Sequence, residues 1–169
     1  MSLIQPDAQH AVVVRAADTE VLGGGPTTTQ LLADADTTNG AISANRVVLR
    51  PGAVGPTPHY HTGSAEIFFV IHGLLQTLVG DRIVELGEGD FLVVPRTLPH
   101  AFAATPDHEA DVLIVFAPAQ TARFEYFRLV DQVLKGQASP HEILDSQARF
   151  DNHFIDSPVW RDRSTGAQP

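Results

Sequence analysis

Short runs of apolar and β-branched residues, separated by Gly, Pro, Asn or Asp, occupy most of the chain up to Pro118. Such runs predict β-strands joined by turns, and therefore an all-β domain. Strands that are apolar on both faces need covering on both sides, and a closed barrel supplies this cover on the inside. The predicted strands are Ala11–Arg15, Glu20–Gly24, Thr27–Ala33, Gly40–Arg50, Ala65–Gly73, Leu74–Gly80, Arg82–Leu86, Asp90–Pro95, His100–Thr105 and Asp111–Pro118.

Two turns can also be placed. Gly80–Asp81 predicts a two-residue hairpin connection, and the GEGD sequence at 87–90 predicts a second reversal of the chain. Both turns join neighbouring strands in an antiparallel arrangement, which supports a β-roll.

An amphipathic pattern replaces the strand runs after Ala119. Apolar residues recur every three or four positions and predict a helix that ends at Gly136. These apolar residues are Phe124, Phe127, Val130 and Leu134. A second helix is predicted to begin at Pro140, because Ser139 and Glu142 have the spacing of a capping box. The apolar face of the first helix either closes the barrel mouth as a lid or packs outside the barrel or against another subunit.

The 169 residues suit one domain with three segments. We expect N-terminal strands over 1–39 that form an edge or a dimer contact, a barrel core over 40–118 and a helical extension over 119–169. An open roll leaves edge strands, and the Ala11–Arg15 strand could add to a neighbour's sheet, so we expect a homodimer.

The charge and composition exclude several partners. The net charge is −9 and the eleven Lys and Arg residues are scattered, which argues against binding nucleic acid or membrane headgroups. The sequence has neither an apolar run of about 18 residues nor the pattern of a signal peptide at its N-terminus, so we expect a cytoplasmic protein. Cysteine is absent, so any metal must be held by nitrogen and oxygen.

Four residues have the pattern of a metal site. His59 and His61 are one residue apart, so on a strand their side chains face the same side and can reach one ion. Glu66 begins a buried apolar run, where a carboxylate needs a compensating partner that a bound cation supplies. His100 follows Pro99 in a second block. We predict that these four residues hold one divalent transition metal, with a metal-free barrel as the alternative.

These residues resemble the two sequence motifs of the cupin superfamily. The first motif is matched by His59, His61, Glu66 and Gly73, and the second by Gly89, Pro95 and His100. The chain departs from the motifs where Thr97 replaces a Gly, where Ala104 replaces an Asn and where Gly52 lies one residue further upstream. The resemblance is close over about residues 40–118 and implies a jelly-roll, double-stranded β-helix barrel, here followed by two C-terminal α-helices.

The same alternation predicts the pocket walls. If Glu66 faces the metal, Phe68, Val70 and His72 share its interior face, and Phe102 shares a face with His100. These residues would suit a flat or apolar organic molecule. His72 could instead be a core or rim histidine bonded to backbone.

An inward Arg or Lys would indicate a phosphosugar or carboxylate substrate. Arg46 and Arg50 are the candidates on neighbouring strands, and either could equally face solvent. We include Arg46 among the predicted pocket residues.

Three imidazoles and one carboxylate leave coordination positions open on Fe, Ni, Mn, Co, Cu or Zn. The ligand set and the RFEYFRLVDQVL extension resemble those of quercetinase-type cupins. This resemblance implies a quercetin 2,3-dioxygenase-like oxidoreductase, with a small aromatic or enolisable substrate, O2 as co-substrate and Glu66 as catalytic base. The alternatives are a non-redox isomerase, cyclase or lyase, and a small-molecule binding module without catalysis.

Overall fold

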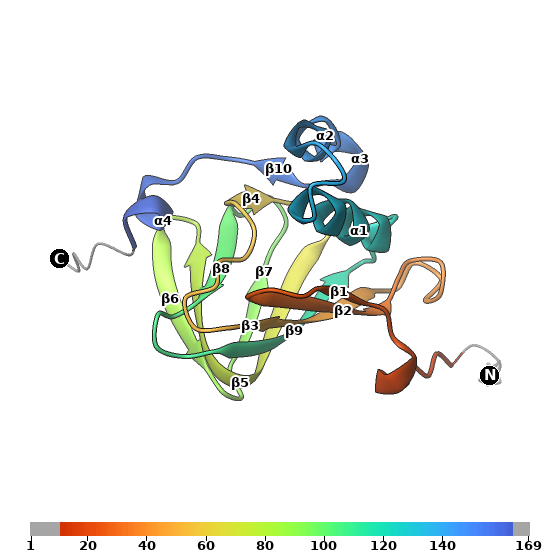
Figure 1. The fold of residues 1–169 in the computed structure, drawn as a ribbon, viewed down its shortest axis with the longest axis horizontal. Coiled ribbons are helices and arrows are strands. Elements are labelled where there is room, and N and C mark those ends of the chain that lie inside the picture. The colour runs from red at the N-terminus through yellow and green to blue at the C-terminus, as the bar shows by residue number, and fades with distance from the viewer. Residues whose placement is uncertain (1–10, 164–169) are drawn as a thin grey trace, which may run out of the picture.

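In the computed structural model, which describes residues 11–163, one long strand runs through both halves of a barrel (Figure 1). This strand, β5 (Ala65–Val79), pairs in its first half with β9 (Ala110–Ala117) and β7 (Phe91–Val94). Its second half pairs with β6 (Arg82–Gly87) and β8 (His100–Ala104), and all these pairings are antiparallel. The two halves of the barrel are therefore joined by continuous backbone.

The sequence analysis predicted two strands here, divided after Gly73. The structure instead continues through Gly73, which adopts a φ of +83°. A Cβ at this position would lie 1.9 Å from the carbonyl oxygen of Glu109, so only glycine allows the two backbones to approach this closely.

The remaining strands complete the sheet order β1-β2-β3-β9-β5-β8-β4-β10. Their bounds are β1 (Val21–Gly23), β2 (Thr27–Ala33), β3 (Ser43–Leu49), β4 (His59–Tyr60) and β10 (His153–Phe154), with a 3-10 turn at Ala16–Asp18 before them. Both predicted turns are present, since Val79 pairs with Arg82, and the Asp90 N–H bonds the Gly87 carbonyl at 3.0 Å. The predicted all-β barrel is confirmed.

The predicted strand at Ala11–Arg15 is wrong for the single chain, in which these residues form no strand. A strand needs a neighbouring backbone to complete its hydrogen bonds, and none pairs with this segment among the described residues. The first ten residues of the predicted 1–39 segment and the last six of the 119–169 extension lie outside the described residues.

Both predicted helices are present, as α1 (Arg123–Leu134) and α2 (Pro140–Asp145), and the capping box at Ser139 and Glu142 is formed. Two further helices follow, α3 (Gln147–Phe150) and α4 (Pro158–Asp162), which are too short to give a periodic apolar pattern. None of the described helices is long and apolar enough to cross a membrane.

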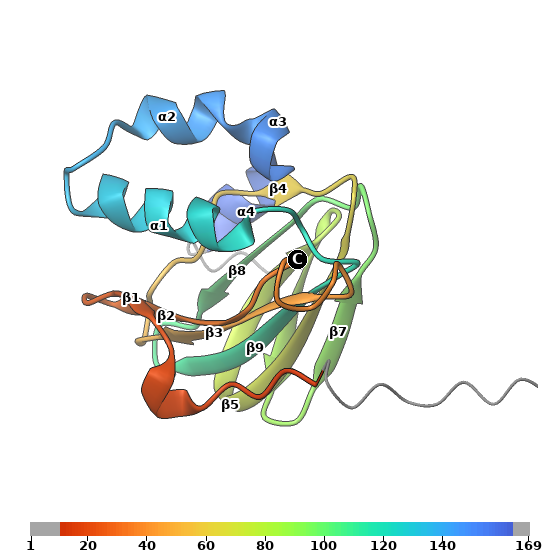
Figure 2. The ribbon, with the colours of Figure 1, turned by 90° about the vertical axis from the view of Figure 1, so that its right-hand side faces the viewer.

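Helices α1, α2 and α3 gather over one end of the barrel, whereas α4 lies beside β6 and β8 (Figures 1 and 2). The position of α1 is fixed at its start by Asp34, whose carboxylate accepts the backbone N–H groups of Arg123 and Phe124 at 3.3 and 3.1 Å. At its other end, the Asp131 carboxylate accepts the Gly23 N–H at 2.9 Å. Contacts at both ends therefore hold α1 over one end of the barrel, which is the position expected of a lid.

Candidate metal centre

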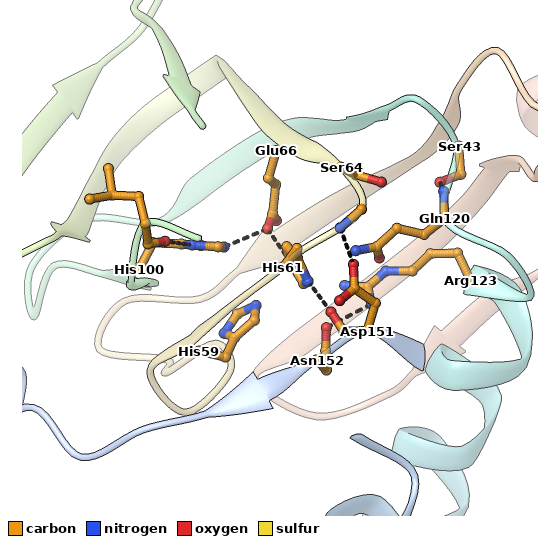
Figure 3. Close-up of polar contacts among 12 residues, drawn as sticks. Ser43, His59, His61, Ser64, Glu66, His100, Gln120, Arg123, Asp151 and Asn152 are labelled. Atoms are coloured by element: carbon orange, nitrogen blue, oxygen red, sulfur yellow. Dashed lines mark hydrogen bonds and ion pairs between the residues drawn. The ribbon is translucent and has the colours of Figure 1, made fainter. Parts of the chain in front are cut away.

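The four predicted ligands meet inside the barrel. One ligand atom from each of His59, His61, Glu66 and His100 lies within 4.8 Å of the others, and all four residues are buried. Glu66 Oε2 lies 2.9 Å from His61 Nε2 and 2.6 Å from His100 Nε2 (Figure 3). Strand β5 supplies Glu66, β8 supplies His100, and the β4 region supplies the other two histidines.

Each imidazole is oriented by a backbone carbonyl on its other nitrogen. His59 Nδ1 lies 2.9 Å from the Thr57 oxygen, and His100 Nδ1 lies 2.9 Å from the Leu98 oxygen. His61 Nδ1 lies 2.5 Å from the Asp151 oxygen. Because a carbonyl only accepts, each Nδ1 carries the proton, and each Nε2 is left to face the centre. This arrangement fits a divalent metal.

The ionisation of the centre follows from burial and close contacts. Burial opposes the charge on Glu66, but the nearby charge of His100 and the hydrogen bonds from His100 and His61 outweigh it, so the pKa of Glu66 is well below its usual range. Burial likewise opposes protonation of His100, yet the Glu66 carboxylate raises the pKa of His100. Burial, with the charges of the other two rings, lowers the pKa of His59 well below its usual value. A bound metal would take the place of the protons that the Glu66 carboxylate shares with His61 and His100.

The C-terminal extension is part of this centre. Strand β10 pairs with β4, placing Phe154 opposite His59. The Asp151 side chain accepts the N–H groups of Thr62 and Gly63 at 2.9 and 2.7 Å, and these residues follow His61 directly. The segment that carries the first two ligands is therefore held in place from the far end of the chain.

A cavity of about 560 Å³ opens beside the centre, with His59 and Glu66 in its wall. The first predicted helix contributes part of this wall, through Phe127, Val130 and Leu134. Other apolar side chains on the wall are Val47, Phe102, Ile114 and Phe116. The volume is in the range of small-molecule sites.

The predicted pocket residues divide into three groups. Phe102 lines the cavity as expected. Phe68 and Val70 point into the barrel, but they are packed in its core, 1% and 0% exposed, and do not reach the cavity. Arg46 and His72 lie outside, so their assignment to the pocket is wrong.

Both errors come from strand geometry. Asn45 and Val47 of β3 face the cavity, so the side chain of Arg46 between them points outward and pairs with Asp111. A register irregularity between Val70 and His72 breaks the alternation of β5. The His72 side chain is therefore 61% exposed and lies 2.9 Å from Glu88.

The polar groups on the cavity wall that sequence reasoning missed include Arg123, Tyr126 and Asn45. A signal for Arg123 was present, because it lies four residues before Phe127 and seven before Val130, on the same helical stripe. Tyr126 is buried, and burial raises the pKa of its hydroxyl. No pattern in the sequence marks Asn45 as inward.

Comparisons with known proteins show which folds this architecture is similar to. Residues 45–116 match the family model described as a cupin domain, and no curated protein matches the chain. An RmlC-like cupin from Shewanella frigidimarina is 23% identical, covering 63% of this chain and 89% of that one with a TM-score of 0.53. KdgF from Halomonas sp. is 24% identical, covering 65% and 96%, with a TM-score of 0.55. The polyketide cyclase RemF from Streptomyces resistomycificus is 20% identical, covering 73% and 96%, with a TM-score of 0.52.

The fold and the site together define the class of this protein: it is an antiparallel barrel that encloses three histidines and one glutamate, a group that could hold a metal ion. Residues 45–116 match the cupin domain and the barrel has the cupin jelly-roll fold, which confirms the resemblance of the motifs. At these identities the solved structures establish the jelly-roll fold alone.

Proposed function

We propose that this protein is a metal-dependent cupin enzyme, and specifically a quercetinase-like dioxygenase that acts on a small aromatic or enolisable substrate. One observation carries the proposal: four converging ligands reach a largely apolar cavity of about 560 Å³ through His59 and Glu66. A substrate in this cavity would contact the centre while its apolar body is shielded from water.

The residues have distinct roles in this proposal. The metal, held by His59, His61, Glu66 and His100, would supply a Lewis acid for an enol oxygen and a site for O2. Glu66 faces the cavity, so its carboxylate is placed to accept the proton of a substrate hydroxyl. Phe102, Phe116 and α1 would hold the ring system and exclude water.

Oxygen uptake tests the proposal. Metal-free protein is loaded separately with Fe, Ni, Mn, Co, Cu or Zn and mixed with quercetin in an oxygen electrode. We expect at least one metal to support O2 consumption that matches the loss of flavonol absorbance, and Glu66→Gln to abolish it. The dioxygenase proposal fails if no metal supports O2 uptake with quercetin or with any other enolisable aromatic compound.

A second candidate is a non-redox isomerase, cyclase or lyase. Arg123 favours it, because a positive charge on the cavity wall can stabilise an enolate without O2. The polyketide cyclase RemF shows that a protein of this fold carries such an activity. Turnover of a polyketide-like or enolisable substrate under strictly anaerobic conditions would favour this candidate over the dioxygenase.

A further inference from the structure

Arg123 is a buried guanidinium that has no ion pair with a carboxylate among the described residues. The residue is only 4% exposed. Its Nη1 donates to Asn152 Oδ1 at 3.0 Å, while its Nε has no partner. Two other charged residues on the cavity wall, Asp131 of α1 and Lys135 directly after it, pair with each other at 2.7 Å. Arg123 therefore brings to the cavity a positive charge that no direct ion pair neutralises, although the more distant carboxylates of Glu66, Asp151 and Asp34 stabilise it.

The guanidinium is held in a fixed position by three aromatic rings. Its central carbon lies 4.2 Å from the ring centroid of Phe116, 4.7 Å from that of Tyr126 and 4.8 Å from that of Phe127. Burial lowers the pKa of Arg123, yet a guanidinium stays protonated throughout the range in which proteins are folded. The positive charge is therefore permanent, and its donors are already oriented.

A second unpartnered group lies on the same wall. Asn45 is 1% exposed, and neither its amide nitrogen nor its amide oxygen has a hydrogen-bond partner. Asn45 and Arg123 both line the cavity that His59 and Glu66 reach. Figure 3 shows the Arg123 side chain extending towards the segment that carries Asp151 and Asn152, next to His61. Buried polar groups normally have partners, so these two indicate a missing ligand.

We propose that the cavity binds an organic anion, with a carboxylate or enolate oxygen on Arg123 and Asn45 and an apolar ring system against the aromatic wall. An anion would accept from the free Nε–H of Arg123 and from the Asn45 amide and would neutralise the buried charge. Arg46, which the sequence suggested for this role, is outside the cavity. This inference rests on the proposed function and defines the charge of its substrate.

Binding of two matched probes tests the inference without turnover. We would compare 2-naphthoate with 2-naphthamide, which share a ring system but differ in charge, by isothermal titration of the zinc-loaded protein. The wild type should bind naphthoate at least about tenfold more tightly, as expected for a charge-assisted hydrogen bond in a buried site. Arg123→Met should reduce this preference about tenfold and leave naphthamide binding within about threefold.

Two control variants separate the binding role of Arg123 from the general effect of losing an arginine. Arg46→Met removes an arginine outside the cavity and should leave the preference unchanged. Asn45→Asp keeps Arg123 but places a carboxylate on the same cavity wall, and should also remove the preference for naphthoate. The inference is overturned if naphthoate does not bind, or if Arg123→Met and Arg46→Met show the same preference as the wild type. Because no oxygen is consumed, failure of the dioxygenase proposal would not affect this result.

Discussion

His61 Nδ1 lies 2.5 Å from the backbone oxygen of Asp151, a contact that spans 90 positions in the sequence. Asp151 adopts a left-handed conformation with a φ of +50°, which aspartate tolerates better than most residues. Its side chain binds Thr62 and Gly63, so one residue orients the ring of a ligand and fixes the loop that follows it. The orientation of the ligand thus depends on the C-terminal extension.

Substitution of Asp151 should weaken metal binding although it is not a ligand. Asp151→Asn preserves the left-handed backbone but removes the charge that accepts the two N–H groups. We expect metal affinity to fall about 10- to 100-fold and the free energy of unfolding to fall by about 2 kcal/mol. Competition with a fluorescent chelator and urea unfolding measure the two effects. Asp156→Asn, at an exposed ion pair, is the matched control, and equal losses in both variants would contradict the account.

The contribution of Asp151 should also depend on pH. Burial opposes its charge, but hydrogen bonds from Thr62 and Gly63 prevail and lower the pKa of Asp151 below its usual range. A lowered pKa stabilises the fold at pH values above the unfolded value, and the contribution is lost as the pH falls through the folded value. The stability difference between wild type and Asp151→Asn should therefore shrink below about pH 4. Urea unfolding of the metal-free proteins measures it, and a difference that is constant with pH would refute the assignment.

Two of the four ligands, His59 and His61, could be predicted because their geometry is local, whereas Glu66 and His100 lie on other strands and were predicted from a buried apolar run and from the motif resemblance. Two histidines one residue apart on a strand share a face, whatever the rest of the fold does. The position of His72 could not be predicted, because the irregularity after Val70 leaves no mark in the sequence. Arg123 reaches the cavity only because α1 docks across the barrel mouth, and the docking of a helix is a tertiary property.

Thr97 should be a source of strain in the loop before His100. It has a φ of +65°, which is unfavourable for a β-branched residue, and the cupin motif has Gly at this position. Relief of that strain, less the entropy cost of glycine, should make Thr97→Gly more stable by about 1 kcal/mol. Thermal unfolding should show a rise of roughly 2–4 °C. Asn39→Gly is the control, because asparagine tolerates its φ of 51°, and a destabilised Thr97→Gly would show that the loop is not strained.

An exposed apolar face leads us to propose that two copies of the chain associate. Phe69 and Phe91 are directly paired on β5 and β7 and are 39% and 62% exposed, and Val93 beside them is 49% exposed. The unpaired valines at 12–14 of the same chain are also exposed and could cover this face of a second copy. Light scattering should show a dimer for the wild type and for Leu144→Lys in α2, but a monomer for Phe91→Lys. A monomeric wild type would rule out the dimer.

The central claim is that the four buried residues bind a metal, and elemental analysis tests it most directly. Wild-type protein purified without added metal would be compared with the double variant His59→Ala/His61→Ala, whose fold is checked by circular dichroism. We predict about one divalent transition metal ion per wild-type chain and almost none in the folded double variant. The claim would be contradicted if the wild type binds no metal even after incubation with Fe, Ni, Mn, Co, Cu and Zn, or if the double variant retains the same amount.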